Sequence, residues 1–348
     1  MAAGGDGGGG VRLVECVPNF SEGRRPDVIR RVVDAAASAS GVRVLDVSSD
    51  AVHNRTVLTL AGEPGTVAEA AFRATRAAAG LIDLRRHQGA HPRIGAMDVI
   101  PLVPVSGVEM AECVACARAL GQRIAGELGI PVYLYAEAAT RPERRELSAI
   151  RRGGFEGLAA EIGRPERLPD FGPPRLHPSA GAIAVGARGF LIAFNVNLGT
   201  SDVAVARRIA RAVRASSGGL PCVQAVGIAG PTPDTVQVSM NLTDYTRTPL
   251  HRVWEEVGRL AAGAGAAVVS AEIVGLVPER ALLEAAEHLA GQEMDGGREG
   301  AAPGSAASPS REAGIALAAR ALRLAGFDLT QVFEVRLAQA VGGEGAGG

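Results

Sequence analysis

Lysine is absent from this sequence of 348 residues, and all 36 basic residues are arginine. A chain without lysine cannot form a lysine Schiff base or supply the lysine of a phosphate-binding P-loop. The sequence also places no G-x-G-x-x-G turn between a strand and a helix, and it has no G-x-S-x-G nucleophile elbow. These absences argue against nicotinamide-dependent, ATP-dependent and serine-hydrolase chemistry.

Charge of one sign and long apolar runs are also missing. The formal net charge is −1, so no charge excess favours a nucleic acid or a membrane surface as partner. No stretch of 18 apolar residues occurs, and the first ten residues lack the charged start and apolar core of a signal peptide. We therefore expect a cytoplasmic protein with no nucleic-acid partner and no membrane partner.

Cysteine is scarce, with four residues in the chain. Cys113 and Cys116 form a C-x-x-C pair, but the surrounding residues have helical periodicity. No second pair and no nearby histidine completes the four ligands of a structural zinc site. We expect two buried helix cysteines and no metal; redox or metal use of the pair is the alternative.

The composition allows a sizeable core, because 47% of the residues are apolar and 21% are charged. A chain of this length suits two domains or a pseudo-symmetric pair. We expect a disordered leader at 1–10, an N-terminal subdomain at 11–188 and a C-terminal subdomain at 189–291. A low-complexity linker at 292–310 and a C-terminal helix with a tail at 311–348 follow.

The order β-α-β-β-α is expected twice, from residues 11 and 189. The first copy has strands at 11–17, 42–48 and 55–62, a helix that begins within 18–40 and a helix at 66–79. The second has strands at 189–198, 221–230 and 234–242, and helices that begin at the N-cap candidate Ser201 and at Thr248. Such a repeat favours an α+β fold of two similar ferredoxin-like subdomains with a cleft where they meet. Two unrelated α+β domains are the alternative.

Polar loops interrupt this pattern and are candidates for function. Residues 17–23 (VPNFSEG) lie at a strand-to-helix turn, which either attracts an anion or only caps the helix. Residues 45–57 join two strands, and we expect a binding loop rather than a solvated turn there, because the connection holds more polar groups than a hairpin needs. Its candidate side chains are Asp46, Asp50, His53, Asn54 and Arg55.

The stretch HQGAHPRIGAMDVIP, residues 87–101, offers the best candidate for catalysis. Pro92 keeps His91 out of the helical region, and glycines on both sides allow a close backbone approach. An imidazole with an ordinary pKa of about 6.5 suits general acid–base work near neutral pH. Arg93 is a fork for a carboxylate, and Asp98 either orients an imidazole or caps a turn. A structural loop histidine is the alternative.

Residues 169–191 (PDFGPPRLHPSAGAIAVGARGFL) are rich in glycine and proline. They are typical of an interdomain segment along a surface, or of a plain linker. The residues alone therefore predict a two-lobed α/β enzyme, with a histidine acid–base and arginines for an anionic substrate.

These motifs together resemble the formiminotransferase domain family. The matching stretches include LVECVPNFSEG, HNRTV, HPRIGAMDVIPLVPV, GQRIAGELGIPVYLY and FLIAFNVNL, in family order and with family-like spacing. The resemblance runs from about Leu13 to Val277, with a weaker match near the C-terminus. One stretch alone would be unspecific, but this many in order are specific.

The resemblance implies transfer of the formimino group from N-formimino-L-glutamate to N5 of tetrahydrofolate, a late step of histidine breakdown. His91 falls on the catalytic histidine, and the fold is expected to hold a folate tunnel between the two subdomains. Arg55 and Arg93 are then candidates for binding the carboxylates, and Asp46 and Asp50 for holding the amidinium. The segment that falls on the folate-binding residues is Gly172, Pro173, Pro174, Arg175, Leu176, His177, Pro178, Ser179, Ala180 and Gly181.

Two departures and two alternatives accompany this resemblance. Animal members carry a tryptophan where this chain has Ala180, so the pterin would stack elsewhere or bind less tightly. Animal members also continue into a cyclodeaminase domain, and we expect that activity to be absent here. The same site could process 5-formyltetrahydrofolate, or the chain could be a folate-binding module with little catalysis. A homodimer is expected from the family.

Overall fold

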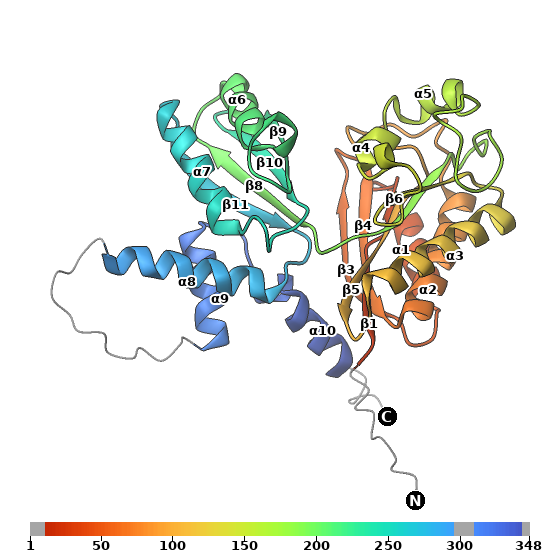
Figure 1. Cartoon of the computed structure of the whole chain (residues 1–348), viewed down its shortest axis with the longest axis horizontal. Helices are drawn as coiled ribbons and strands as arrows, with labels where there is room; N and C mark the ends of the chain where they lie inside the picture. The colour runs from red at the N-terminus through yellow and green to blue at the C-terminus, as the bar shows by residue number, and fades with distance from the viewer. Residues whose placement is uncertain (1–10, 296–309, 343–348) are drawn as a thin grey trace, which may run out of the picture. The chain divides into compact units, whose positions relative to one another are not determined.

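The computed structural model describes residues 11–295 and 310–342, so the expected leader and residues 296–309 of the expected linker lie outside the described residues. The chain forms two compact units, one that runs up to Arg188 and one of Gly189–Gln339. Each unit has a sheet and helices of its own (Figure 1). The expected α+β class is therefore confirmed.

The first unit contains a seven-stranded sheet in the order β3, β4, β1 with β2, β5, β7, β6. Strands β1 and β2 each pair with both β4 and β5, so they act as one interrupted strand. Strands β5, β7 and β6 are mutually parallel, and the other pairs are antiparallel. The strands are β1 (Leu13–Cys16), β2 (Asn19–Phe20), β3 (Arg43–Asp50), β4 (Arg55–Gly62), β5 (Met97–Ser106), β6 (Val132–Ala136) and β7 (Ile183–Ala187).

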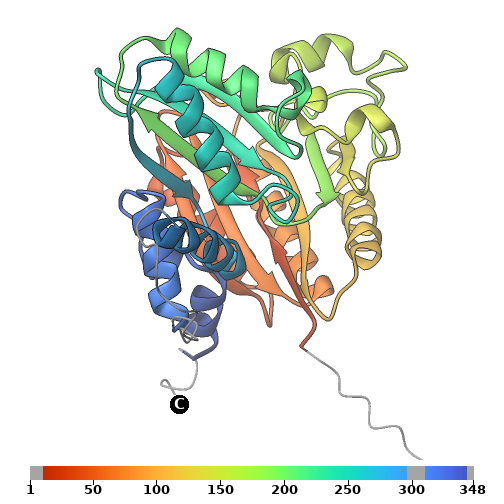
Figure 2. The same cartoon turned by 60° about the vertical axis from the view of Figure 1, so that its left-hand side comes forward.

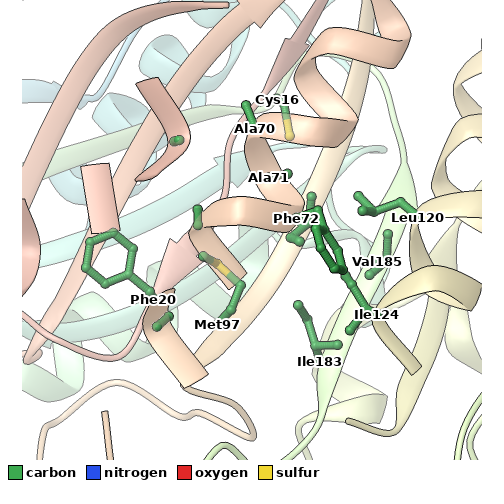
Figure 3. Packing of buried hydrophobic residues seen from close by; sticks show 14 of the residues in the cluster. Cys16, Phe20, Ala70, Ala71, Phe72, Met97, Leu120, Ile124, Ile183 and Val185 are labelled. Carbon is green, nitrogen blue, oxygen red and sulfur yellow. The ribbon is translucent and has the colours of Figure 1, made fainter. Parts of the chain in front are cut away.

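Helices α1 (Pro26–Ala37), α2 (Pro64–Leu81) and α3 (Met110–Leu128) pack against this sheet. Their apolar stripes and the strands form one core, and Figure 3 shows Phe72 of α2 among side chains from α3 and β7. Phe72 is fully buried, and the guanidinium of Arg123 lies 3.7 Å from its ring centre. Burial of the sheet face against these helices stabilises the sheet, and the sheet in turn positions the loops at the ends of its strands.

The first helix begins later than the sequence indicated. Residues 18–25 are not helical: Asn19 and Phe20 extend the first strand as β2, and α1 starts at Pro26. Proline suits the first helical position because its missing N–H has no partner there anyway. The polar residues 21–25 (SEGRR) therefore precede the helix and are not part of it.

The segment at 169–191 is not a linker, which corrects the sequence interpretation. Its second part forms β7, a buried strand between β5 and β6. Side chains of β7 enter the helix-side core on one face and, on the other face, a smaller cluster that includes Ile150 and Leu158. These two residues come from α4 (Leu147–Ile150) and α5 (Gly154–Glu161), which follow a short 3-10 helix, η1 (Pro142–Arg144). A strand covered on both faces has no polar alternation, which explains why it was overlooked.

The second unit has a four-stranded antiparallel sheet in the order β11, β8, β10, β9. Both units share a topology: β1–α1–β3–β4–α2–β5 and β8–α6–β9–β10–α7–β11 place the first strand between the third and the fourth. The expected β-α-β-β-α order is thus present in both halves. The strands are β8 (Ile192–Leu198), β9 (Val223–Ala229), β10 (Val236–Leu242) and β11 (Val268–Val274).

Helices α6 and α7 lie side by side over one face of this second sheet (Figures 1 and 2). The N-cap of α6 is Asp202, whose side chain accepts from the N–H of Ala204, so the expected cap at Ser201 is wrong by one residue. Asp and Ser are equally good caps, and the sequence alone does not separate neighbours. The helices are α6 (Val203–Val213), η2 (Ala215–Ser217), α7 (Leu250–Gly263), α8 (Glu279–Asp295), α9 (Arg311–Ala321), η3 (Leu329–Gln331) and α10 (Phe333–Gly342).

Two boundaries of the expected linker and tail differ in detail. Helix α8 continues to Asp295, and Ser310 caps α9 by accepting from the N–H of Ala313. Ile315 and Ala318 of α9 are buried in the core of the second unit. The expected C-terminal helix is present as α9, which begins at Arg311 and contributes to that unit's core.

Candidate active site

The loop that carries His91 is fixed by hydrogen bonds from three directions. One carboxylate oxygen of Asp98 accepts from the backbone N–H groups of Ile94 and Gly95, at 2.7 and 3.3 Å. The hydroxyl of Ser21 donates to the carbonyl of Gly95 at 2.7 Å. The N–H of Ala90 donates to the carbonyl of Val52 at 3.2 Å. Asp98 therefore caps a turn, which is one of the two roles expected for it.

Two positions of this loop require glycine, because backbone atoms of other segments lie in direct contact with them. A Cβ on Gly89 would lie 2.2 Å from the carbonyl oxygen of His53. A Cβ on Gly95 would lie 2.0 Å from the carbonyl oxygen of Ala182. Real Cβ atoms do not approach backbone oxygens so closely, so both positions exclude every larger residue.

The polar stretch at 45–57 is a hairpin and not an extended loop, which corrects the sequence interpretation. Strand β3 continues to Asp50, β4 begins at Arg55, and these two residues are cross-strand partners. Opposite charges directly across a strand pair are favourable, so Asp50 and Arg55 suit the end of a hairpin. Asn54 closes the turn with a left-handed φ of 50°.

His91 contacts the first residue of β4. Nη1 of Arg55 lies 2.5 Å from Nε2 of His91. A guanidinium can only donate, so Nε2 accepts, and the imidazole is neutral with its proton on Nδ1. His53 adds an edge-to-face ring contact with His91, at 6.5 Å between ring centres.

The electrostatics around His91 disfavour its protonated form. Burial, followed by the charges of Arg55 and Arg151 and by His53, lowers the pKa of His91 from 6.5 to about 2. Burial, followed by the neighbouring charge of Arg151, lowers the pKa of Arg55 to about 10. Arg55 is therefore a cation beside a neutral imidazole in a partly buried place, which is suited to an anion, whereas Arg151 is paired with Asp98.

Arg151 is the residue of this site that the sequence interpretation missed. Its Nε and Nη2 donate to the second carboxylate oxygen of Asp98, so Asp98 joins the histidine loop to Arg151. Asp98 is 1% exposed, which makes the pair a buried one. No motif surrounds Arg151, and its only signal is a pair of arginines before two glycines.

Arg93 points to a different set of partners. It forms two hydrogen bonds with the carboxylate of Glu156, both at 2.9 Å, and two with His87, through the ring Nδ1 and the carbonyl, both at 3.1 Å. Four of the five donors of a guanidinium are thus in use. Nε2 of His87 in turn lies 2.9 Å from the carbonyl oxygen of Asn54. Arg93 ties loops together and offers no open fork.

Asn54 is also engaged on both ends of its side chain. Its Oδ1 accepts from the N–H of Gly23 at 2.9 Å, and its Nδ2 donates to the carbonyl of Gln88 at 2.9 Å. With an exposed fraction of 7%, it links the β2 turn to the histidine loop. This contact pattern is that of a residue that holds the loop in place.

The remaining predicted side chains lie along β3 and its turn. Asp50 accepts from the N–H of His53 at 2.7 Å, and its Oδ2 lies 3.1 Å from Nδ1 of the His53 ring. Burial raises the pKa of Asp50, but the hydrogen bonds of His53 outweigh it and hold that pKa below the usual value. Asp46 lies further back on β3, opposite Thr59. His53 is about half exposed, and it is the one whose ring contacts His91.

The segment at 172–181 lies against the histidine loop. The N–H of Ala96 donates to the carbonyl of Ala180, and that of Ala182 to the carbonyl of Ile94, both at 2.9 Å. Gly181 has a left-handed φ of 72°, and a Cβ there would lie 2.2 Å from the carbonyl of Ile94. The two stretches that the resemblance assigned to catalysis and to folate are thus neighbours in one unit. Ala180 itself is 2% exposed.

The turn at 17–23 is structural. Glu22 accepts from the N–H groups of Arg24 and Arg25 and forms an ion pair with the Arg25 side chain at 2.5 Å. Asn19 donates to the carbonyl of Val17 at 2.8 Å. These side chains satisfy the backbone before α1, so the cap interpretation explains them fully.

The cysteine pair lies on α3, as expected from its periodicity. Cys113 is buried and Cys116 partly buried, and burial raises the pKa of both thiols, that of Cys113 to about 11. In the described part of the chain, no group of three or more His, Cys, Asp or Glu side chains is placed to hold a metal ion. Within residues 11–295 and 310–342, no helix has the length and apolar character needed to cross a membrane.

Comparison with known proteins decides the family. Residues 13–188 match the formiminotransferase domain, N-terminal subdomain, and residues 193–296 match the formiminotransferase domain. Together these matches take in most of the chain. The chain belongs to the formiminotransferase domain family.

Relatives within this family include stand-alone and larger enzymes. A glutamate formimidoyltransferase of Thermoplasma acidophilum is 50% identical over 280 residues, which are 80% of this chain and 92% of that protein. One of Streptococcus pyogenes is 43% identical, over 80% of this chain and 93% of that protein. A formimidoyltransferase-cyclodeaminase of Gallus gallus is 48% identical, over 80% of this chain and 52% of that protein.

Proposed function

We propose that this chain is a glutamate formimidoyltransferase, which transfers the formimino group of N-formimino-L-glutamate to N5 of tetrahydrofolate. The products are 5-formimidoyltetrahydrofolate and L-glutamate, and the reaction belongs to histidine degradation. The observation that carries the proposal is the 50% identity to a named glutamate formimidoyltransferase over 92% of that relative. The contact of His91 with Arg55, beside the 172–181 segment, supports it chemically.

His91 is the proposed acid–base of the transfer. N5 of tetrahydrofolate attacks the amidine carbon, and the resulting tetrahedral adduct breaks its bond to the glutamate nitrogen. The N5 nitrogen loses one proton, and the leaving amine gains one. A neutral imidazole can take the first proton and return it in the second step. The unprotonated Nε2 is the atom suited to this task.

Arg55 is the proposed contact for a substrate carboxylate. In the free protein it occupies Nε2 of His91, so an anion that draws Arg55 away would release the base. The same anion would neutralise nearby positive charge and raise the pKa of His91 towards neutral. Substrate binding would therefore switch on the histidine.

The other predicted side chains receive different proposed roles. For Arg93 and Asn54 we propose the positioning of the histidine loop, since their polar atoms are held by Glu156, His87 and backbone groups. Asp46, Asp50 and His53 remain proposed substrate contacts, with Asp50 and His53 supported by their place at the hairpin end beside His91. Tetrahydrofolate is the proposed co-substrate, at residues 172–181.

The finer points of the fold are also proposals. We assign a ferredoxin-like topology to both subdomains, which is supported by the matching strand order in the two sheets. A division at 11–188 and 189–291 is supported by the boundary between the compact units after Arg188. The folate tunnel, the homodimer and the cytoplasmic location remain predictions from the resemblance and the composition.

A coupled assay with tetrahydrofolate and N-formimino-L-glutamate tests this function. It follows formation of 5-formimidoyltetrahydrofolate by the wild type, by His91→Ala and by His288→Ala, a matched histidine control in α8 of the second unit. We expect turnover by the wild type and the control, and a loss of about a hundredfold or more in kcat for His91→Ala.

Other outcomes separate the alternatives. Turnover of 5-formyltetrahydrofolate without turnover of N-formimino-L-glutamate would replace the proposed substrate. Folate binding without turnover of either compound would make the chain a binding module. Equal activity of His91→Ala and the wild type would remove His91 from the reaction.

A further inference from the structure

Helix α4 presents Arg151 to the histidine loop, although the helix has only four residues. Arg151 is the C-cap of this helix, and its guanidinium holds the carboxylate of Asp98. Asp98 in turn holds the N–H groups of Ile94 and Gly95. So short a helix has little stability of its own, because nucleating a helix is unfavourable. The direction of the Arg151 side chain must therefore be fixed from outside α4.

Arg167 supplies this support from the loop that follows α5. Its Nη1 donates to the carbonyl of Ala149 at 3.0 Å, and its Nη2 donates to the carbonyls of Ile150 and Arg152, both at 3.1 Å. Carbonyls at the end of a helix lack partners within the helix, and a cation suits them. These carbonyls lie on both sides of Arg151 in sequence, so one guanidinium fixes the backbone from which Arg151 projects.

The first sheet holds Arg167 in turn. Arg167 is 8% exposed, and its carbonyl accepts from the hydroxyl of Tyr133 on β6 at 2.6 Å. Burial raises the pKa of Tyr133 to about 12, so the phenol stays protonated and donates. Nε of Arg167 lies 3.6 Å from a carboxylate oxygen of Glu161. The support thus starts at a buried strand, and α4 packs in the same apolar cluster as that strand (Figure 1).

Stability alone explains the buried arginine at 167 poorly. Removing a guanidinium from water is costly, and a well-packed apolar side chain in its place is often equally stable or more stable. An apolar side chain cannot hold carbonyls in fixed directions, whereas the planar fork of a guanidinium can. Arg167 therefore contributes geometry, at the place where the backbone carries Arg151.

We propose that Arg167 is a positioning residue for the transfer: it fixes Arg151, and Arg151 fixes the loop of His91 through Asp98. Arg167 acts through Arg151 and not on the substrate. The proposal rests on the proposed function, since it assigns the support of the proposed base. The members of this relay are Tyr133, Arg167, the backbone of 149–152, Arg151, Asp98 and the backbone of 94–95, all within the first unit.

Loss of Arg167 should lower kcat and leave the KM for N-formimino-L-glutamate nearly unchanged. Without this support, Arg151 and Asp98 no longer hold the histidine loop in one place, and small displacements of an acid–base group reduce the rate steeply. The proposed carboxylate contact, Arg55, is the first residue of β4 and does not depend on the relay. Catalysis and substrate capture should therefore separate.

Single and double variants of the full chain test the relay. Arg167→Met removes the hydrogen bonds to the carbonyls and keeps an unbranched side chain, and Arg167→Lys keeps the charge without the planar fork. Arg151→Gln removes the next member, alone and together with Arg167→Met. Arg164→Met is the control, because Arg164 lies in the same loop and also pairs with Glu161, but its side chain is 59% exposed.

The measurements separate catalysis, binding and folding. The coupled assay gives kcat and the KM for N-formimino-L-glutamate, and urea unfolding gives the stability of each variant. NMR records the ring signals of His91, which are assigned with His91→Gln and which need no turnover.

We expect kcat of Arg167→Met to fall by about tenfold to hundredfold, with a KM within about threefold of the wild type. Arg167→Lys should lie between the two, because an ammonium can donate to these carbonyls but lacks the fork. Arg167→Met should add no further loss of kcat in the Arg151→Gln background, since both residues act along one path. The His91 ring signals should shift or broaden in Arg167→Met, and Arg164→Met should match the wild type.

Several results would overturn the proposal. These are a wild-type kcat of Arg167→Met, and losses of kcat that add fully in the double variant. A lower stability with an unchanged kcat would assign Arg167 to folding alone. If Arg167→Met does not fold, a wild-type kcat of Arg167→Lys is the contradicting result.

The His91 signals keep this proposal apart from the proposed function. A wild type that is inactive, but whose His91 signals respond to Arg167→Met, would end the proposed function and leave the relay in place. A wild type that is active, but whose His91 signals and kcat ignore Arg167→Met, would end the relay and leave the function.

Discussion

Arg55 donates a hydrogen bond to Nε2 of His91 across 2.5 Å, and the neighbouring charge and burial favour the neutral imidazole. The proposed base and the proposed anion contact are thus partners before substrate arrives. An arginine that leaves the imidazole for a carboxylate would expose the unprotonated nitrogen at the moment when it is needed. This relationship makes the state of His91 measurable.

The pKa of His91 should rise when Arg55 is replaced. In Arg55→Gln the second-largest cause of the lowered pKa is gone, since burial remains but one cation is removed. Titration of the imidazole by NMR, assigned with His91→Gln, should show a neutral ring from pH 5 to 8 in the wild type and a higher pKa in the variant. An unchanged His91 titration curve would contradict the electrostatic account.

Acid should destabilise the protein partly through His91. Its pKa is about 2 when folded and about 6.5 when unfolded, so between these values the unfolded chain binds more protons. Stability from this group is complete above about pH 6.5 and is lost as the pH falls towards 2. The free energy of unfolding, measured with urea, should therefore fall less for His91→Gln than for the wild type between pH 7 and pH 5. We expect the difference to be on the order of 1 kcal/mol, because the group is partly buried. Parallel curves would rule this contribution out.

Breaking the buried pair of Asp98 and Arg151 should destabilise the first unit. In Asp98→Asn the guanidinium of Arg151 loses the carboxylate that it is paired with, and such losses cost about 3–5 kcal/mol. Urea unfolding measures the change. Asp83→Asn, in an exposed pair with Arg85, is the control and should leave stability unchanged. Equal stability of both variants would mean that the buried pair is not needed.

Gly95→Ala should disturb the histidine loop, whereas Gly80→Ala should be harmless. A Cβ at 95 meets the backbone oxygens of Ala182 and Met97 within 2.3 Å, while a Cβ at 80, in α2, meets nothing within 4 Å. We expect Gly80→Ala to raise stability by about 0.5–1 kcal/mol, because alanine is the better helix former. Thermal unfolding and kcat of both variants check this. A Gly95→Ala protein with wild-type kcat would show that the loop tolerates displacement.

The helical and strand repeat was predictable because its apolar residues follow clear periods. Strand β7 was not, since Ile183–Ala187 is short, rich in alanine and glycine, and covered on both faces. Both strands of the hairpin were predicted, but the end of β3 was taken for part of a binding loop because Ser49 and Asp50 are polar. Pairing across the sheet outweighs such local preferences.

Much of the candidate site was also predictable. The residues around His91 restrict its backbone in ways that the sequence displays, through Pro92 and the flanking glycines. Arg151 and Glu156 were not predictable, because their partners Asp98 and Arg93 lie more than 50 positions away in sequence. Such pairs depend on how the chain folds over the sheet, and arginine is too common in this sequence to mark them.

Chemical rescue of His91→Ala by free imidazole tests the central claim most directly. The transfer from N-formimino-L-glutamate to tetrahydrofolate is followed as the imidazole concentration rises, with His288→Ala as the control. The account predicts a poor enzyme whose rate increases with imidazole and with the basicity of substituted imidazoles, while the control stays unaffected. A His91→Ala enzyme that turns over at the wild-type rate without imidazole would contradict it.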